Sequence, residues 1–244
     1  MAPEVHQNDL PRIHRSFVVL GSSGMLGRAW TQHLGSLGVL PIRPTMEELD
    51  LAASDGPACI TPQRLARMTA KIATPNHAGH GTCVVNCAAY TDVDRAESEE
   101  HAAREINAHG VARLARACRA IGATLVHYST DYVFDGQASE PYSVDHPRAP
   151  INAYGRTKAE GEAAIEQELA LGLEALIIRT SWLYAPWGRN FVRTIVRRAI
   201  EHPSLKVVHD QRGRPTSAEH LARASLRLLE SGARGTFHMA DGGA

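Results

Sequence analysis

Residues 17–27 have the sequence FVVLGSSGMLG, in which a short apolar run ends abruptly at three glycines spaced three positions apart. The run predicts a buried β-strand, and Leu26, Trp30 and Leu34 recur at helical spacing around and after the last glycine. In such a strand–turn–helix unit the first glycine permits the tight turn, the second lets the backbone approach a pyrophosphate, and the third lets helix and strand pack closely. The stretch therefore favours a dinucleotide, its phosphates at the helix N-terminus, over an ordinary glycine turn.

The rest of the chain alternates between short apolar runs and helix-patterned stretches. This alternation predicts an α/β fold with a Rossmann-type, doubly wound parallel sheet that has helices on both faces. We expect a polar leader at 1–16, a dinucleotide-binding domain at 17–182, and a small, shortened C-terminal substrate lobe at 183–244 that is interleaved with the sheet. The apolar runs are 39–43, 84–86, 125–128 and 176–178, and the helical patterns are 94–121, 154–171, 191–200 and the residues after a capping-box sequence at 216–219.

The composition favours a small charged ligand over a polymer. The 244 residues are 43% hydrophobic and include 26 basic and 26 acidic side chains, so the formal net charge is zero. This balance gives no general attraction to nucleic acid or to a membrane surface. Residues 1–16 lack a signal-peptide core, and no apolar run approaches the roughly 20 residues that cross a bilayer, so we expect a cytoplasmic protein.

The four cysteines predict neither a disulfide nor a metal site. No pair of them has C-x-x-C or zinc-type spacing. Cys83 and Cys87 lie in one predicted strand, where four residues span roughly 13 Å, which is too far for a disulfide. We expect buried free thiols.

Several positions after the predicted strands suit a dinucleotide. Arg43 stands where many NAD enzymes carry an acid, so it favours NADPH, with its 2′-phosphate, over NADH; the alternative is a surface arginine beside a proline turn. Asp50, followed by Leu51, either contacts the adenine end or caps a turn. The small residues in 86–91 either let a flat cofactor lie against the backbone or pack a strand on a helix.

Tyr154 and Lys158 open a predicted helix at a spacing that places phenol and ammonium on one face. A neighbouring cation favours the ionised phenol and lowers its pKa, which suits proton transfer near neutral pH. The sequence 129–131, Ser-Thr-Asp, ends a predicted strand just before this helix. A hydroxyl there can bond a substrate carbonyl beside the phenol, whereas the alternative is a polar turn closed by Asp135 and Gly136.

Six motifs in order carry a resemblance to a known family. They are GSSGMLG, NCAAYTDVDRAE, STDYVFDG, YGRTKAEGE, RTSWLYAPWGRNFV and DQRGRPT, which together cover most of residues 17–216. The chain resembles the extended short-chain dehydrogenase/reductases, and within them the group of dTDP-4-dehydrorhamnose reductases. The resemblance implies transfer of a hydride from NADPH, or NADH, to the 4-keto group of a dTDP-linked 6-deoxyhexulose, forming dTDP-L-rhamnose.

The resemblance also implies roles for individual residues. Tyr154 would protonate the sugar oxygen, and Lys158 would tune the phenol and hold the nicotinamide ribose. The substrate would be oriented by Thr130 and Asp131, lined by Trp182 and, at its nucleotide part, faced by Asn190 with Arg189. The alternatives are that Trp182 is a core residue and that Asn190 only caps a helix. The implied cofactor-binding residues are Gly21, Ser23, Gly24, Met25, Leu26, Gly27, Arg43, Asp50, Leu51, Ala88, Ala89, Tyr90, Tyr154 and Lys158.

Other functions stay open at the level of sequence. A homodimer, sometimes with Mg²⁺ at the contact, is implied by the resemblance, although no carboxylate cluster marks such a site. A reductase or epimerase of another nucleotide sugar would keep the fold and cofactor, because substrate choice lies in the shortened lobe. A non-catalytic NAD(P)-binding regulatory subunit is the third alternative. The intact Thr130, Tyr154 and Lys158 argue against it, and the chain end at Ala244 argues faintly for it.

Overall fold

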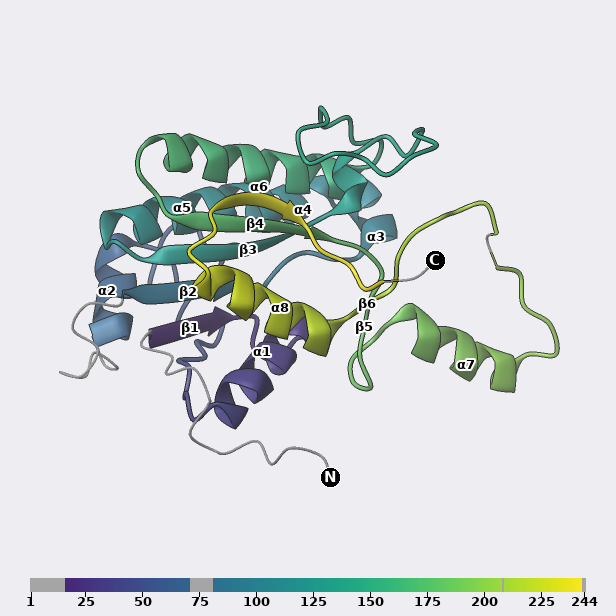
Figure 1. Cartoon of the computed structure of the whole chain (residues 1–244), viewed down its shortest axis with the longest axis horizontal. Helices are drawn as coiled ribbons and strands as arrows, with labels where there is room; N and C mark the ends of the chain where they lie inside the picture. The colour runs from purple at the N-terminus through teal and green to yellow at the C-terminus, as the bar shows by residue number, and fades with distance from the viewer. Residues whose placement is uncertain (1–15, 71–80, 208, 243–244) are drawn as a thin grey trace, which may run out of the picture.

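Five parallel strands form the central sheet, in the order β1-β2-β3-β4-β7 (Figure 1). The computed structural model describes residues 16–70, 81–207 and 209–242. A second sheet of two short parallel strands, β5 and β6, lies beyond the end of β4. The strands are β1 (Ser16–Leu20), β2 (Thr82–Asn86), β3 (Thr124–Thr130), β4 (Ala175–Thr180), β5 (Leu183–Tyr184), β6 (Thr216–Ser217) and β7 (Gly235–His238).

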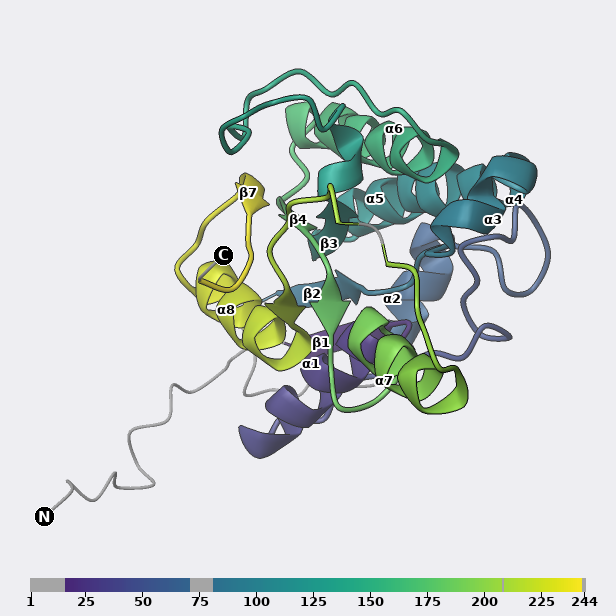
Figure 2. The same cartoon turned by 90° about the vertical axis from the view of Figure 1, so that its right-hand side faces the viewer.

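Helices cover both faces of the central sheet, which confirms the doubly wound prediction (Figures 1 and 2). One core cluster joins α2, α5 and α6 to alternate strand residues such as Val18, Val84 and Leu125. The other joins α1 and α8 to the intervening residues, including Val85 and Val126. Because both faces are buried, the strands read as continuous apolar runs. The helices are α1 (Met25–Ser36), α2 (Pro62–Ala70), α5 (Val111–Ala120), α6 (Ala153–Ala170) and α8 (Ala218–Glu230).

The predicted strand at 39–43 is wrong in extent. Only Ile42 pairs with the sheet, through a parallel bridge to Val18, with hydrogen bonds to the backbones of Phe17 and Val19. Pro41 and Pro44 flank this residue, and proline has no N–H to donate to a strand ladder. The chain therefore passes on one side of β1 before it crosses to β2 on the other. This reversal creates the crevice at the carboxyl ends of the strands where ligands bind in open α/β sheets.

The helical prediction for 94–121 holds, but the segment is broken at Glu99. It comprises α3 (Val93–Ser98), α4 (Glu100–Arg104), a π-helical turn η3 (Glu105–Gly110) and then α5. The prediction for 154–171 matches α6 closely. A single 3₁₀ turn, η4 (Asp131–Val133), follows β3.

Helix α7 (Phe191–Glu201) forms where the pattern at 191–200 predicts a helix, but its apolar stripe does not pack into a core. None of its residues is buried, and Ile200 at the end of its apolar stripe is 82% exposed. Figure 1 shows α7 standing away from the sheet, whereas α8 returns to pack on α1 and β7 pairs with β4. Helix α8 and strand β7 thus belong to the central fold. Among the described residues, no helix combines the length and apolarity that a bilayer crossing requires.

Candidate active site

A cavity of about 1240 Å³ opens at the carboxyl ends of the strands, where the topology predicts a ligand. The ends of β1, β2 and β3 supply one side, and the segments around β5 and the start of α7 supply the other. Its lining includes residues 20–26, 43–46, 49–51, 86–89, 128–132, 180–184 and 188–189, together with Tyr154 and Lys158.

The glycine turn fits closely between β1, β2 and α1. Gly21 has φ +67°, and a Cβ there would lie 2.7 Å from the backbone nitrogen of Ala88. A Cβ on Gly27 would lie 2.1 Å from the carbonyl oxygen of Gly21. Helix α1 begins at Met25 with no side-chain cap from Gly24 and no acidic residue in its first turn. This bare positive helix end at the cavity wall suits a diphosphate, so the cradle fits a dinucleotide.

Most of the other expected cofactor residues line the same cavity. Asp50 also accepts a hydrogen bond from the backbone nitrogen of Ala52 at 2.9 Å, so it forms a turn as well as facing the cavity. Gly27 lies behind the lining, where it packs against Gly21. The residues of this set that line the cavity are Gly21, Ser23, Gly24, Met25, Leu26, Arg43, Asp50, Leu51, Ala88, Ala89, Tyr154 and Lys158.

Tyr90 is placed differently from the cofactor-binding role expected for it. Its hydroxyl donates to Glu99 Oε2 at 2.7 Å, and the residue is not part of the cavity lining. The amide of Asn107 holds the Tyr90 backbone from both sides, because Tyr90 N donates to Oδ1 at 2.9 Å and Nδ2 donates to the Tyr90 carbonyl at 3.0 Å. Tyr90 therefore ties the loop after β2 to the junction of α3 and α4 and to η3.

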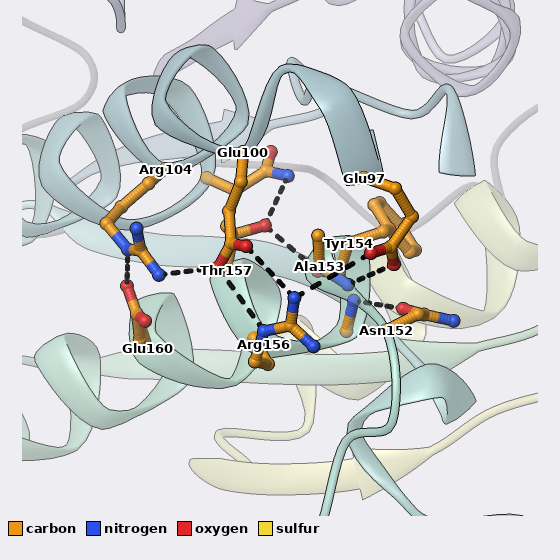
Figure 3. A network of polar contacts seen from close by, with 11 residues as sticks. Glu97, Glu100, Arg104, Asn152, Ala153, Tyr154, Arg156, Thr157 and Glu160 are labelled. Carbon is orange, nitrogen blue, oxygen red and sulfur yellow. Dashed lines mark hydrogen bonds and ion pairs between the residues drawn. The ribbon is translucent and has the colours of Figure 1, made fainter. Parts of the chain in front are cut away.

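The first turn of α6, which carries Tyr154, is anchored by polar contacts from two directions (Figure 3). Asn152 Oδ1 caps the helix by accepting from Gly155 N at 2.7 Å, and Glu97 Oε1 accepts from Ala153 N at 2.7 Å. A Cβ on Gly155 would lie 2.1 Å from the Tyr132 carbonyl oxygen, so the helix sits directly against η4. These contacts fix the register of the helix.

Ion pairs between α4 and α6 extend this anchoring along the next turns (Figure 3). Arg156 pairs with Glu100 at 2.9 Å, and Arg104 bridges Glu100 and Glu160 at 2.7 and 2.8 Å. The pairs are partly exposed, so each contributes little free energy by itself. As a network they hold α6 in one orientation toward the cavity.

Tyr154 is partly buried and lines the cavity, but the state of its phenol differs from the sequence-based expectation. Burial raises the pKa of Tyr154, the Asp131 carboxylate raises it further, and only the Thr130 hydroxyl opposes the shift. The expected lowering by Lys158 is wrong for the free protein. The reason is geometric, because Lys158 Nζ donates to the Tyr128 carbonyl at 2.6 Å. At neutral pH the phenol keeps its proton.

Lys158 is 2% exposed and reaches the sheet beneath the cavity. Burial lowers its pKa from 10.5 to about 8, and the Glu162 carboxylate on the next turn opposes the shift. An ammonium loses favourable hydration when it is buried, so this direction is the one that burial dictates.

Thr130 and Asp131 stand beside Tyr154 at the end of β3, as the sequence predicts. Thr130 Oγ1 donates to Asp131 Oδ1 at 3.0 Å and accepts from Tyr132 N at 3.2 Å. Surrounding protein atoms raise the pKa of Asp131, while the bond from Thr130 lowers it. Both residues line the cavity, so a carbonyl placed there would meet a hydroxyl donor next to the phenol. The expected turn at Asp135 also forms, with Gly136 at φ +70°.

Trp182 faces the cavity and Asn190 does not. Trp182 is 43% exposed and has φ +44°, a left-handed conformation that is strained for a tryptophan. Its ring packs on Gly213, where a Cβ would lie 2.7 Å away, so it is not a core residue. Asn190 is buried and caps α7: Oδ1 accepts from Arg193 N at 3.1 Å and Nδ2 donates to the Ala185 carbonyl at 2.9 Å. The structure favours the capping role for Asn190 over contact with a substrate.

Comparison with known proteins decides the family. The family model described as the RmlD substrate binding domain matches residues 15–244. The chain belongs to the RmlD family. Among curated relatives, the dTDP-4-dehydrorhamnose reductase of Burkholderia thailandensis is 39% identical over 236 residues, covering 93% of this chain and 72% of that protein. A Streptomyces niveus relative named dTDP-4-keto-6-deoxy-D-glucose reductase is 38% identical over 227 residues, covering 93% of this chain and 73% of its own length.

Solved structures agree with this assignment to the RmlD family. A dTDP-4-dehydrorhamnose reductase from Clostridium acetobutylicum superposes with a TM-score of 0.79 at 37% identity, covering 93% of this chain and 75% of that one. The Bacillus anthracis dTDP-4-dehydrorhamnose reductase in complex with NADP gives a TM-score of 0.79 at 34% identity, with 94% and 75% covered. The RmlD-family fold is therefore shared over nearly the whole of this chain.

Two polar residues of this RmlD-family chain near Lys158 were missed by sequence reasoning. Asn86 ends the otherwise apolar strand β2 at the cavity, His127 lies inside β3, and hydrogen bonds link Asn86 to His127 and His127 to Lys158. Polar residues that interrupt a buried strand were the available signal. The magnesium ion that the resemblance allows has no support in the described residues, which contain no group of three or more potential metal-ligating side chains.

Proposed function

We propose that this protein is an NADPH-dependent reductase of the 4-keto group of a dTDP-linked 6-deoxyhexulose, forming dTDP-L-rhamnose. The observation that carries the proposal is that Tyr154, Lys158 and Thr130 line one cavity with the glycine turn of a dinucleotide fold. The names of relatives about 40% identical to the chain support the same activity. The protein would act on a small molecule in the cytoplasm, and pairing into a homodimer belongs to the same proposal.

The glycine turn and the start of α1 would hold the diphosphate of the cofactor. When bound, NADPH supplies the hydride that reduces the keto carbon. The 2′-phosphate would lie toward Arg43, which lines the cavity near Asp50 and Leu51. Residues 17–182 would thus bind the cofactor, while Trp182 at the end of this domain and Arg189 in the 183–244 lobe would face the sugar nucleotide.

Tyr154 would protonate the sugar oxygen as the keto group is reduced. The phenol is protonated at neutral pH, so its proton is available when charge develops on that oxygen. Thr130 would hydrogen-bond the same oxygen, and Asp131 would orient the sugar. Lys158, anchored on the Tyr128 carbonyl, would hold the nicotinamide ribose from below.

A reductase of a different dTDP-linked 4-keto sugar is the second candidate. The Streptomyces niveus relative supports it, because that protein is named for another keto sugar at nearly the same identity. A regulatory subunit without catalysis fits less well, since Thr130, Tyr154 and Lys158 keep an arrangement that has no purpose without chemistry.

The proposal is tested by following NADPH oxidation with dTDP-4-dehydrorhamnose, and in parallel with NADH. Tyr154→Phe is the control, because it removes the proton donor and keeps the ring. Turnover by the wild type that is about 10²–10⁴-fold faster than that of the variant is expected. If the wild type oxidised NADPH no faster than the variant, the proposal that this protein is an enzyme would be rejected. Turnover with dTDP-4-keto-6-deoxy-D-glucose alone would show that this sugar, and not dTDP-4-dehydrorhamnose, is the substrate. Cofactor binding without any turnover would favour the regulatory subunit.

A further inference from the structure

His127 contacts Lys158, Asn86 contacts His127, and neither has a role in the mechanism above. They are register partners on β2 and β3, so their side chains project to the same face, the one that α6 covers. Each is only 1% exposed. A buried polar group costs free energy unless it is hydrogen-bonded, so the position of every proton in this group is constrained.

The hydrogen bonds of Asn86 fix the orientation of its amide. The backbone N–H of Ala88 donates to Asn86 Oδ1 at 3.1 Å, which requires an oxygen on that side. The Nδ2 group therefore faces His127, where it lies 3.1 Å from Nδ1. Because Nδ2 is only a donor, Nδ1 of His127 must be the acceptor, and a neutral imidazole then carries its proton on Nε2.

The Nε2–H group of His127 points toward Lys158. Nε2 lies 3.3 Å from Lys158 Nζ, which also donates to the Tyr128 carbonyl. An ammonium has donors only and cannot accept from Nε2–H, whereas a neutral amine has a lone pair that can. The imidazole itself stays neutral, because burial holds the pKa of His127 well below its ordinary value and the charge of Lys158 lowers it further.

The other ionisable groups around Lys158 are few within the described part of the chain. Glu162, one turn further along α6, favours the ammonium. Its carboxylate is shared with Arg179 at 2.7 Å and Arg148 at 2.9 Å, so its charge is largely neutralised. Tyr154, one turn earlier on α6, carries a phenol that is neutral at pH 7. His127 is the group from β3 that meets the amine directly.

We propose that His127 is a positioning residue that donates its Nε2–H to Lys158 Nζ and so favours the neutral amine of that lysine. Its catalytic meaning rests on the proposed function. The Tyr154 phenolate that each reduction leaves must regain a proton from water, and Lys158 lines the same cavity, so a lysine that exchanges its proton readily would assist this step. Asn86 sets the tautomer of His127 and so acts one step further away.

The tautomer of His127 in the wild-type protein is the first test. Long-range ¹H–¹⁵N NMR distinguishes Nε2–H, Nδ1–H and the imidazolium, and His127→Gln assigns the signal among the 13 histidines. The neutral Nε2–H form at pH 7 is expected. An Nδ1–H form or an imidazolium would overturn the proposal, and this result does not depend on whether any variant folds.

The pKa of Lys158 is the second test, and the sequence makes it accessible. Lys71, Lys158 and Lys206 are the only lysines in the chain, so ¹³Cε-labelled lysine gives three signals that can be assigned by single Lys→Arg variants. His127→Leu removes the donor, and the pKa of Lys158 should rise by about one unit. An unchanged or lowered pKa would contradict the proposal.

His127→Gln is the matched control for the leucine variant. Its Oε1 can accept from Asn86 Nδ2, which leaves its N–H toward Lys158, so the pKa of Lys158 should stay near the wild-type value. The signals of Lys71 and Lys206 should not move in either variant. A rise in both variants would show that the imidazole acts by packing alone and would end the proposal.

The pH profile of kcat/KM links the lysine to the proposed reaction. In His127→Leu, the part of the pH profile that reflects the ionisation of Lys158 should move to higher pH, by as much as the pKa of Lys158 measured by NMR. A purely structural role of His127 would instead lower kcat/KM equally at every pH. Absence of turnover with any keto sugar would remove the proposed function and leave the NMR results to decide the role of His127. If His127→Leu showed full turnover and an unchanged pKa of Lys158, the role proposed for His127 would be rejected and the proposed function would stand.

Discussion

Gly27 and Gly21 approach so closely that a Cβ on Gly27 would lie 2.1 Å from the carbonyl oxygen of Gly21, a distance that real Cβ atoms essentially never show. Position 27 therefore requires glycine, because α1 packs directly against the turn that precedes it. Gly35 in the same helix is different, because its Cβ would meet nothing within 4 Å in the described structure.

Alanine at these two positions should have opposite effects. Gly27→Ala forces backbone to move and should lower the free energy of unfolding by about 1–3 kcal/mol, with weaker NADPH binding. Gly35→Ala should raise it by about 0.5–1 kcal/mol, because alanine favours the helix and limits the unfolded chain. Urea unfolding and a fluorescence titration with NADPH measure both. Equal effects would contradict the packing argument.

As the N-cap of α6, Asn152 should contribute about 1 kcal/mol to the free energy of unfolding. Asn152→Ala removes the acceptor for Gly155 N, so we expect that loss in urea unfolding and a reduced kcat, because Tyr154 lies in the first turn. Asn152→Asp keeps an acceptor and is the matched control. If the aspartate variant lost as much stability as the alanine variant, capping would not be the contribution of Asn152.

Lys158 should make stability depend on pH above neutrality. Its pKa is about 8 in the folded protein and 10.5 ordinarily, so between these values the unfolded chain binds more protons and folding gains with rising pH. The free energy of unfolding of the wild type, relative to Lys158→Met, should rise by about 1.4 kcal/mol per pH unit in that window. Urea unfolding of both proteins from pH 7.5 to 10 measures it. If the difference in free energy of unfolding between the two proteins did not change with pH, the pKa of Lys158 would not be lowered in the folded protein.

Arg43 should distinguish the two nicotinamide cofactors. If it binds the 2′-phosphate, Arg43→Ala raises the Kd for NADPH about tenfold or more through loss of a charged hydrogen bond, while the Kd for NADH hardly changes. Titration calorimetry with each cofactor makes the comparison, and NADH serves as the internal control. A similar loss for both would place Arg43 outside the phosphate site.

The sequence was most informative where one physical requirement decides the structure. The glycine turn needs small residues and close packing, and the apolar runs at 84–86, 125–128 and 176–178 correspond to strands β2, β3 and β4. Helix α6 was predicted equally well, because both the spacing of Tyr154 and Lys158 and the length of the stretch 154–171 are typical of a helix. The fold class and the main cavity followed from these elements.

What could not be predicted depends on contacts between distant segments. Tyr90 turns toward Glu99, and Ile42 pairs alone because prolines flank it. The pKa of Tyr154 rises because the phenol is buried and lies near Asp131, and Lys158, which donates to the Tyr128 carbonyl, does not offset this rise; helical spacing reveals none of these contacts. The apolar stripe of α7 indicates a helix and says nothing about what it packs against.

The position of Tyr154 and Lys158 at the hydride-transfer site is tested most directly by isotope transfer. The protein is incubated with dTDP-4-dehydrorhamnose and NADPH deuterated on the transferred position of the nicotinamide, and the product is examined by mass spectrometry and NMR. The account predicts one deuterium at C4 of the sugar, formed by the wild type and strongly reduced with Tyr154→Phe. Unlabelled sugar, or equal transfer by the variant, would contradict it.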